Sequence, residues 1–232
     1  LLHQLSRWAE AAGVTLRGPS YVSQFAELLL ALARQAGQPV VVLIDEYDKP
    51  LIEHLGQGPA AMAVARANRD ILRSFFGVLK GADVTDVTRF VLLTGVSRFS
   101  RASVFSTLNN LRDISINAQY ATFLGYTQTE LETYFSAWLA HFAEDTNSTP
   151  AQVIARLARH YNGYRFSTKP IKVYNPFSVL NALSDENYRN YWFETGTPTF
   201  LINLLRERQY ALPELEGLEV GPSVFSTFEL ER

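Results

Sequence analysis

The stretch VVVLIDEYDKP, residues 40–50, decides how the rest of the chain is interpreted. Five apolar residues, four of them β-branched, run directly into the two adjacent carboxylates Asp45 and Glu46. An apolar run that does not alternate with polar residues is typical of a strand buried on both faces, in the middle of a parallel sheet. Parallel sheets with flanking helices bind their ligands beyond the carboxyl ends of the strands. The sequence therefore predicts that Asp45 and Glu46 lie at the functional edge of such a sheet.

Apolar residues followed by Asp-Glu form the Walker B pattern of P-loop ATPases. In that pattern Asp45 would be associated with Mg²⁺, usually through water, and Glu46 would orient and deprotonate the attacking water. A structural alternative is that acidic residues after a strand cap the next helix. Asp48, which precedes Lys49-Pro50, suits the capping role. Asp45 and Glu46 come before it and remain the candidates for chemistry.

A second apolar run, in RFVLLTGVSRFSR at residues 89–101, also ends in polar residues. A long amphipathic helix is expected between the two runs, over residues 60–80, so the order is that of a right-handed βαβ unit. In ATPases with a glutamate base, the strand beside Walker B ends in a sensor residue. Thr94 occupies that place, and Arg98 and Arg101 follow it. An arginine there could neutralise phosphoryl charge in its own subunit or in a neighbouring one; a solvated loop is the alternative.

The bulk composition is that of an ordinary globular protein. The chain has 232 residues, of which 47% are hydrophobic and 19% charged, and its net charge is −2. This charge argues against a strongly basic nucleic-acid surface. The lack of cysteine excludes thiolate metal sites and suits the reducing cytoplasm. Neither a membrane span nor a signal peptide is evident. Because the only methionine is Met62, we expect the chain to be a fragment.

The first part of the chain has the pattern of helices around these two strands. Helices are expected over residues 1–12, 23–36 and 102–111, a loop over 83–86, a short strand over 113–117, and a helix over 127–143 with a capping box of Thr127 and Glu130. The buried side of the helix over residues 60–80 should contain Val64, Ala67, Ile71, Phe75, Val78 and Leu79. A polar break at residues 145–150 is the best candidate for a domain boundary.

The remainder is predicted to be mostly helical with a small hairpin. Helices are expected over residues 151–161, 176–183 and 198–208, and residues 164–166 could pair with residues 171–174. We therefore expect a partial P-loop NTPase core over residues 1–145 and a helical, winged-helix-like lid over residues 146–232. The fold class is α/β, with a parallel sheet flanked by helices.

The sequence lacks a phosphate-binding loop and the motifs of other enzyme classes. No G-x-x-x-x-G-K-[ST] phosphate-binding loop occurs in these residues, and without it triphosphate affinity should be poor. The four histidines are scattered, and no G-x-S-x-G nucleophile elbow is present. The acid-Tyr-acid-Lys stretch at residues 46–49 has the residue types of a PD-(D/E)XK nuclease in the wrong spacing. Tyr161, Tyr164 and Phe166 are expected in the core rather than in a base-stacking platform.

Several blocks of the chain together resemble the bacterial AAA-ATPase-like family. They are VVLIDEYDKPL (41–51), LLTGVSRFSRASVF (92–105), LNNLRDISI (108–116), ATFLGYTQTEL (121–131), YNGYRFS (161–167), YNPFSVL (174–180) and NYWFETGTPTFL (190–201). The resemblance implies a P-loop core and a winged-helix-like region. It also implies that Asp45 is the Mg²⁺-associated aspartate, that Glu46 is the catalytic glutamate, and that residues 94–98 hold the sensor. Members often carry a PD-(D/E)XK nuclease-like domain. The family's Walker A segment is not in this sequence.

Our leading hypothesis is the central part of a cytoplasmic ATPase that uses Mg-ATP to move residues 127–205 against the core. The expected ligands are ATP and Mg²⁺, and a homo-oligomer, a protein partner or a fused nuclease-like domain are the partners considered. One alternative is a nucleotide-dependent switch or scaffold with little turnover. Another is the ATPase module of a nucleic-acid-processing protein.

Overall fold

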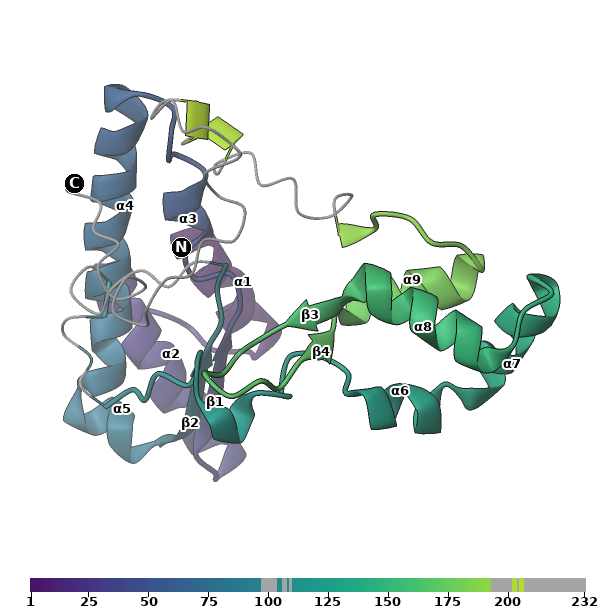
Figure 1. Ribbon diagram of the computed structural model, residues 1–232. Helices are drawn as coiled ribbons and strands as arrows, with labels where there is room; N and C mark the ends of the chain where they lie inside the picture. Colours follow the sequence, from purple (N-terminus) through teal and green to yellow (C-terminus); the bar gives the residue numbers. More distant parts are fainter. Residues whose placement is uncertain (97–103, 106–107, 109, 193–201, 204, 207–232) are drawn as a thin grey trace. The chain divides into compact units, whose positions relative to one another are not determined.

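The computed structural model describes residues 1–96, 104–105, 108, 110–192, 202–203 and 205–206 (Figure 1). The elements up to residue 96 are α1 (Leu2–Ala11), α2 (Tyr21–Ala36), β1 (Val40–Ile44), α3 (Lys49–Ile52), α4 (Pro59–Gly77), the 3-10 helix η1 (Val78–Lys80), α5 (Ala82–Asp86) and β2 (Thr88–Leu93). Those that follow are the 3-10 helix η2 (Ala118–Tyr120), α6 (Gln128–Tyr134), α7 (Ser136–Asp145), α8 (Pro150–Tyr161), β3 (Asn162–Tyr164), β4 (Val173–Tyr174) and α9 (Pro176–Asp185). The helix expected over residues 198–208 falls largely outside the described residues. Of residues 102–111, the described ones (104–105, 108 and 110–111) are not helical.

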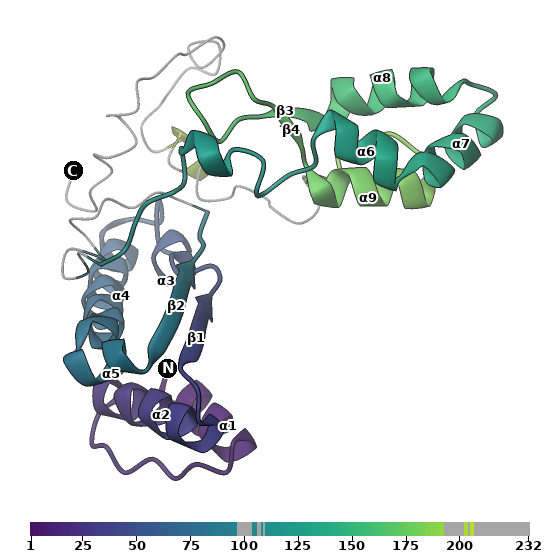
Figure 2. The same cartoon turned by 90° about the horizontal axis from the view of Figure 1, so that it is seen from below.

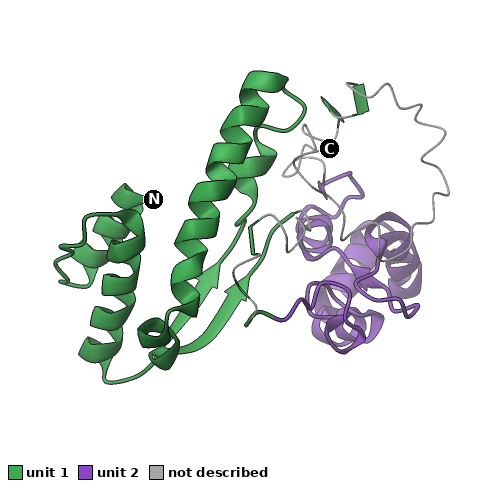
Figure 3. Cartoon of the chain, turned by 90° about the vertical axis from the view of Figure 1, so that its left-hand side faces the viewer, with its two compact units in different colours: residues 1–111, 199–232 green, residues 112–198 purple. Residues whose placement is uncertain are grey.

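The chain forms two compact units, the first built mainly from Leu1–Leu111 and the second from Arg112–Pro198 (Figure 3). The polar stretch at residues 145–150, where the sequence suggested a boundary, is a connection inside the second unit. It joins α7 to α8, and these helices pack together through a shared core that includes Phe142 and Leu157. The assignment of an NTPase core and a lid stays a prediction.

The first unit contains a parallel pair of strands, β1 and β2, which lie side by side in Figures 1 and 2. From Val41 opposite Phe90 to Ile44 opposite Leu93 the pairing is continuous. Helices α3, α4 and α5 connect the two strands. The parallel βαβ arrangement predicted from the two apolar runs is therefore present, and the described residues form a mixed α/β structure.

Burial of β1 differs from the prediction of a strand covered on both faces. Val42 is buried, but Val41 is 53% and Leu43 67% exposed, and Phe90 on β2 is 52% exposed. Side chains alternate between the two faces of a sheet, and in the described structure helices cover only the face that carries Val42. An unbroken apolar run thus belongs here to a strand that is buried on one face.

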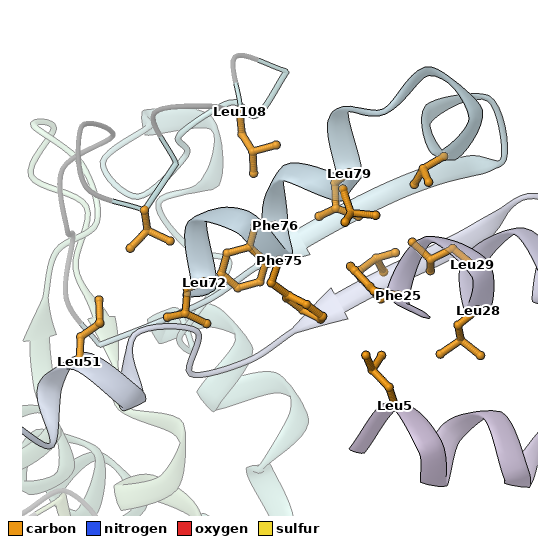
Figure 4. Packing of buried hydrophobic residues seen from close by; sticks show 14 of the residues in the cluster. Leu5, Phe25, Leu28, Leu29, Leu51, Leu72, Phe75, Phe76, Leu79 and Leu108 are labelled. Carbon is orange, nitrogen blue, oxygen red and sulfur yellow. The ribbon is translucent and has the colours of Figure 1, made fainter. Parts of the chain in front are cut away.

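The core of the first unit lies between α2, α4 and the sheet (Figure 4). Phe25 of α2 stacks on Phe75 of α4 with 4.2 Å between ring centroids. Helix α2 ends where predicted, because Gly37 adopts the left-handed conformation with φ of 63°. The long helix α4 was predicted correctly, but its buried stripe differs. Ala65, Leu72, Phe75 and Phe76 are buried, whereas Val64, Ala67 and Ile71 are exposed.

Three further expectations for the chain were wrong in detail. Residues 82–86 form the short helix α5 rather than a loop, and residues 113–117 contain no strand. The helix expected over residues 127–143 is broken at Phe135 into α6 and α7, and Phe135 packs its ring against Tyr126 at 5.2 Å. The break lets partly buried Phe135 pack against the core of the second unit, which is a tertiary effect that helical periodicity does not predict.

The second unit has helices α6 to α9 around one hydrophobic core, with the short strands β3 and β4 at one end of the helices (Figure 2). The strands are antiparallel, with Asn162 opposite Tyr174 and Tyr164 opposite Val173. The predicted hairpin is therefore present, with its first strand two residues earlier than expected. The winged-helix character of this region stays a prediction. Among the described residues, no helix has both the length and the apolar character required to cross a membrane.

The capping box of α6 predicts a specific acid sensitivity. The Thr127 backbone N–H donates to Glu130 at 2.8 Å, and this bond together with that from the Thr127 hydroxyl lowers the pKa of Glu130 below its usual value of 4.5. A carboxyl group whose pKa is lower in the folded than in the unfolded state stabilises the fold at pH values above the unfolded-state pKa. This stabilisation is lost as the pH falls through the folded-state pKa. We expect Glu130→Gln, which keeps an acceptor at every pH, to lose less stability than the wild type between about pH 6 and pH 3.

Urea unfolding followed by circular dichroism at several pH values measures this slope. Glu144→Gln, a change on α7 outside the capping box, is the matched control and should follow the wild-type slope. Parallel curves for Glu130→Gln and the wild type would contradict the proposed role of the box.

Candidate functional site

The candidate site lies where β1 and β2 end beside each other. Their last paired residues are Ile44 and Leu93. The ladder continues past them, since the Thr94 N–H donates to the Ile44 carbonyl at 2.9 Å and the Tyr47 N–H donates to the Thr94 carbonyl at 3.0 Å. These two bonds hold the turn after β1 against the residue after β2. The two polar strand ends that the sequence singled out are therefore adjacent.

Asp45 and Thr94 make direct side-chain contact across the two strand ends. The Thr94 hydroxyl donates a hydrogen bond to Asp45 Oδ1, and the Glu46 backbone N–H donates to the same oxygen at 2.9 Å. Asp45 directly follows β1 and Thr94 directly follows β2, so the contact between their side chains depends on the register of the sheet. The Asp45 side chain is exposed to solvent, and both hydrogen bonds use only one of its two carboxylate oxygens. These two bonds orient the Asp45 carboxylate.

Glu46 has an unusual backbone conformation. Its φ is 50°, in the left-handed region that residues other than glycine rarely adopt. Such a conformation costs roughly 1–3 kcal/mol and is often found at functional sites. The Glu46 carboxylate lies 3.2 Å from the Lys49 ammonium, with both side chains more than half exposed. An ion pair this exposed contributes little, so the carboxylate can leave Lys49 readily.

Asp48 does not have the role that the sequence predicted for it. It was expected to cap the following helix, but its side chain makes no capping hydrogen bond to α3. It is completely buried, and its Oδ1 accepts the Val96 N–H at 3.2 Å. A buried carboxylate requires such partners. The signal available in the sequence was the Gly95 that follows Thr94, because only a residue without a side chain leaves space for Asp48 there.

Gly95 is in close contact with the turn after β1. A Cβ atom built on Gly95 would lie 2.7 Å from Asp48 Oδ1 and 2.7 Å from a ring carbon of Tyr47. The Tyr47 ring also packs on Phe105, with 4.7 Å between the centroids. The turn that carries Asp45 and Glu46 is thus held in place by the close packing of buried Asp48, the Tyr47 ring and Gly95.

The oxygen donors of Asp45 and Thr94 are compatible with Mg²⁺. It commonly uses one or two carboxylates and fills its remaining positions with water and phosphate oxygens. Exposed Asp45, with the Thr94 hydroxyl beside it, provides this kind of partial site. Within the described ranges there is no cluster of three or more His, Cys, Asp or Glu side chains that could hold a metal without such added ligands. Arg98 and Arg101, expected near the phosphates, lie outside the described residues.

The comparisons with known proteins include the part of the chain that carries the candidate site. Residues 1–105 match a family model, AAA-ATPase_like, described as "Predicted AAA-ATPase". A relative from Azotobacter chroococcum mcd 1, described as an uncharacterized protein in the vnfD 5′ region, is 38% identical over 221 residues. This match covers 95% of the present chain but only 39% of the relative. No solved structure gives a significant match.

The matched segment contains β1, β2 and the strand-end residues Asp45, Glu46 and Thr94. The resemblance deduced from VVLIDEYDKPL and LLTGVSRFSRASVF is therefore confirmed for this segment, whereas the blocks after residue 105 lie beyond the family match. Residues 1–105 of this chain are thus similar to the AAA-ATPase-like family.

Proposed function

We propose that this chain is the central part of a cytoplasmic AAA-type ATPase, and that the longer protein binds and hydrolyses Mg-ATP to drive a conformational change. One observation carries the proposal. The ends of two parallel strands bring the Walker-B-type Asp45 into hydrogen-bonding contact with Thr94, in a segment that matches a predicted ATPase family. Because these 232 residues contain no Walker A motif, the phosphate-binding loop in this proposal belongs to another segment of the longer protein.

Each residue of the strand ends has a separate task in this proposal. Asp45 would hold Mg²⁺ through water, and the bound ion would supply positive charge to the phosphate oxygens. Thr94 keeps Asp45 oriented through its hydroxyl and serves as the sensor. Glu46 accepts a proton from the attacking water as general base. For this step its carboxylate must leave Lys49, which the exposure of that ion pair makes easy.

Arg98 and Arg101 complete the proposal as the groups that neutralise charge on the transferred phosphoryl group, within one subunit or across a homo-oligomer. The nucleotide cycle would move residues 127–205 against the core and so act on a protein partner or a fused effector domain. A switch that binds ATP with little turnover is the second candidate.

The deciding experiment is steady-state ATP hydrolysis with Mg²⁺ by the longer protein that contains this chain. Glu46→Gln should still bind ATP but turn it over at least about 100-fold more slowly, the effect typical of losing a general base. Glu53→Gln removes an exposed carboxylate seven positions further along the chain and should leave turnover unchanged. Equal turnover by wild type and Glu46→Gln would refute the assignment of Glu46. Binding without turnover in the wild type would favour the switch.

The packing at Gly95 gives a second prediction. In Gly95→Ala the new methyl group would overlap the Asp48 carboxylate, and because Asp48 is completely buried it cannot move into solvent. We expect a loss of about 1–3 kcal/mol of unfolding free energy, the usual cost of overpacking, together with reduced ATP turnover because the turn that carries Glu46 shifts.

Thermal and urea unfolding measure the stability change, and the hydrolysis assay measures the turnover. Gly81→Ala is the control, because its Cβ would approach only one atom, the Val78 carbonyl oxygen, at 3.3 Å. If Gly95→Ala were as stable and as active as Gly81→Ala, the close contact between Gly95 and Asp48 would have no functional importance.

A further inference from the structure

The small net charge of the chain conceals a segregation of charge within the second unit. Residues 146–184 contain five Lys and Arg residues and no Asp or Glu, whereas residues 112–145 contain one Arg and five acidic residues. The five cations of the first segment are all exposed: Arg156, Arg159, Arg165, Lys169 and Lys172. Such an asymmetry between neighbouring segments is typical of a surface that contacts an anionic partner.

Most of these cations lie where α8 passes into the hairpin of β3 and β4 (Figure 2). Arg159 is in the last turn of α8, Arg165 directly follows β3, and Lys172 directly precedes β4. Because Tyr164 pairs with Val173, the next residues along the hairpin, Arg165 and Lys172, are brought close together. Like charges placed opposite each other in this way destabilise a hairpin, and an anion between them would remove that cost.

The acidic residues of the second unit do not neutralise this surface. No ion pair within the described residues uses any of the five cations. The acids have other partners: Glu130 is held in the capping box of α6, Glu132 accepts the Gln128 side-chain N–H at 2.6 Å, and Glu186 contacts His141. The positive potential of the hairpin is therefore available to an external anion.

The loop between β3 and β4 is ordered by its own hydrogen bonds. The Arg165 guanidinium donates to the carbonyls of Thr168 and Lys169, both at 3.2 Å. The Lys169 N–H donates to the hydroxyl of buried Ser167 at 3.0 Å. Lys169 and Lys172 thus extend from a fixed backbone, and a surface that is ordered before binding loses less entropy when it binds.

Exposed aromatic rings lie beside these cations. Tyr164 directly precedes Arg165 and is 44% exposed. Trp192 is 41% exposed and lines the same surface hollow as Tyr164. A cationic surface for the phosphates with aromatic side chains on which bases stack is the combination found in proteins that bind single-stranded nucleic acid. A duplex keeps its bases stacked within the helix and would contact the cations alone.

We propose that this end of the second unit binds single-stranded nucleic acid. Arg159, Lys169 and Lys172 contact phosphates, and one base stacks on the exposed Tyr164 ring. Every base has a π-face, so stacking of this kind gives little sequence preference. The proposed ATPase site is in the first unit, and the strand-binding surface goes beyond that proposal.

The first test is a fluorescence-anisotropy titration of a labelled oligo(dT) of about 15 nucleotides with the whole chain. We expect saturable binding that weakens roughly 20-fold between about 50 and 200 mM salt, the effect of three phosphate contacts on a single strand. Lys169→Gln and Lys172→Gln should each reduce the slope of log affinity against log salt by about 0.7 to 1. Lys80→Gln, the same change at an exposed lysine of the first unit, should leave the slope unchanged.

The second test separates the ring of Tyr164 from the surrounding charge. Tyr164→Leu should bind the oligonucleotide roughly 5- to 150-fold more weakly, the range for one stacked base. Tyr164→Phe keeps the ring and should bind as the wild type does. Since this side chain is nearly half exposed, we expect the two variants to have similar melting temperatures, so that a difference in affinity is not a difference in folding.

Three outcomes would overturn the proposal. The first is no saturable binding at about 50 mM salt, and the second is an unchanged salt slope in both lysine variants. The third is equal affinity of Tyr164→Leu and wild type together with equal affinity for a duplex of the same length, which would indicate a surface for any polyanion. The titration contains no ATP and the residues that it tests lie in the second unit, so its result is independent of the proposed ATPase.

Discussion

The backbone ladder that continues beyond β1 and β2 is the constraint on which the candidate site depends. The bonds between Thr94 and the backbone of Ile44 and Tyr47 fix which side chains meet at the strand ends. In a sheet, a slip by one residue turns every side chain of a strand to the opposite face. Such a slip would separate the Thr94 hydroxyl from Asp45. The chemistry is therefore determined by the register of two strands and, behind it, by the helices that hold this register.

The large features of the fold could be predicted because they are local. The apolar runs predicted β1 and β2, Gly37 predicted the end of α2, and Thr127 with Glu130 predicted the start of α6. The buried stripe of α4 could not be predicted, since its alanine-rich first half offers two neighbouring stripes and only the packing against α3 and α2 selects one. The exposure of Leu43 could not be predicted either, because it depends on which elements cover the second face of the sheet.

The site was predictable to the same extent. Asp45, Glu46 and Thr94 follow apolar strands, and parallel strands bring their ends together, so these residues could be found from pattern and topology. The role of Asp48 required knowledge that residues 47 positions apart, Asp48 and Gly95, are in contact. Polar residues that directly follow an apolar strand can be recognised in the sequence, whereas the burial of a polar side chain cannot.

The left-handed backbone at Glu46 limits which amino acids the position tolerates. Glycine enters this conformation without cost, asparagine and aspartate enter it more readily than most residues, and β-branched residues are excluded from it. Substitution by valine or isoleucine would therefore combine loss of the carboxylate with a distorted turn, and its phenotype could not be assigned to either cause. In a saturation mutagenesis experiment, the ranking of glycine and asparagine against valine at this position would report on the backbone, and the comparison of glutamate with glutamine would report on the chemistry.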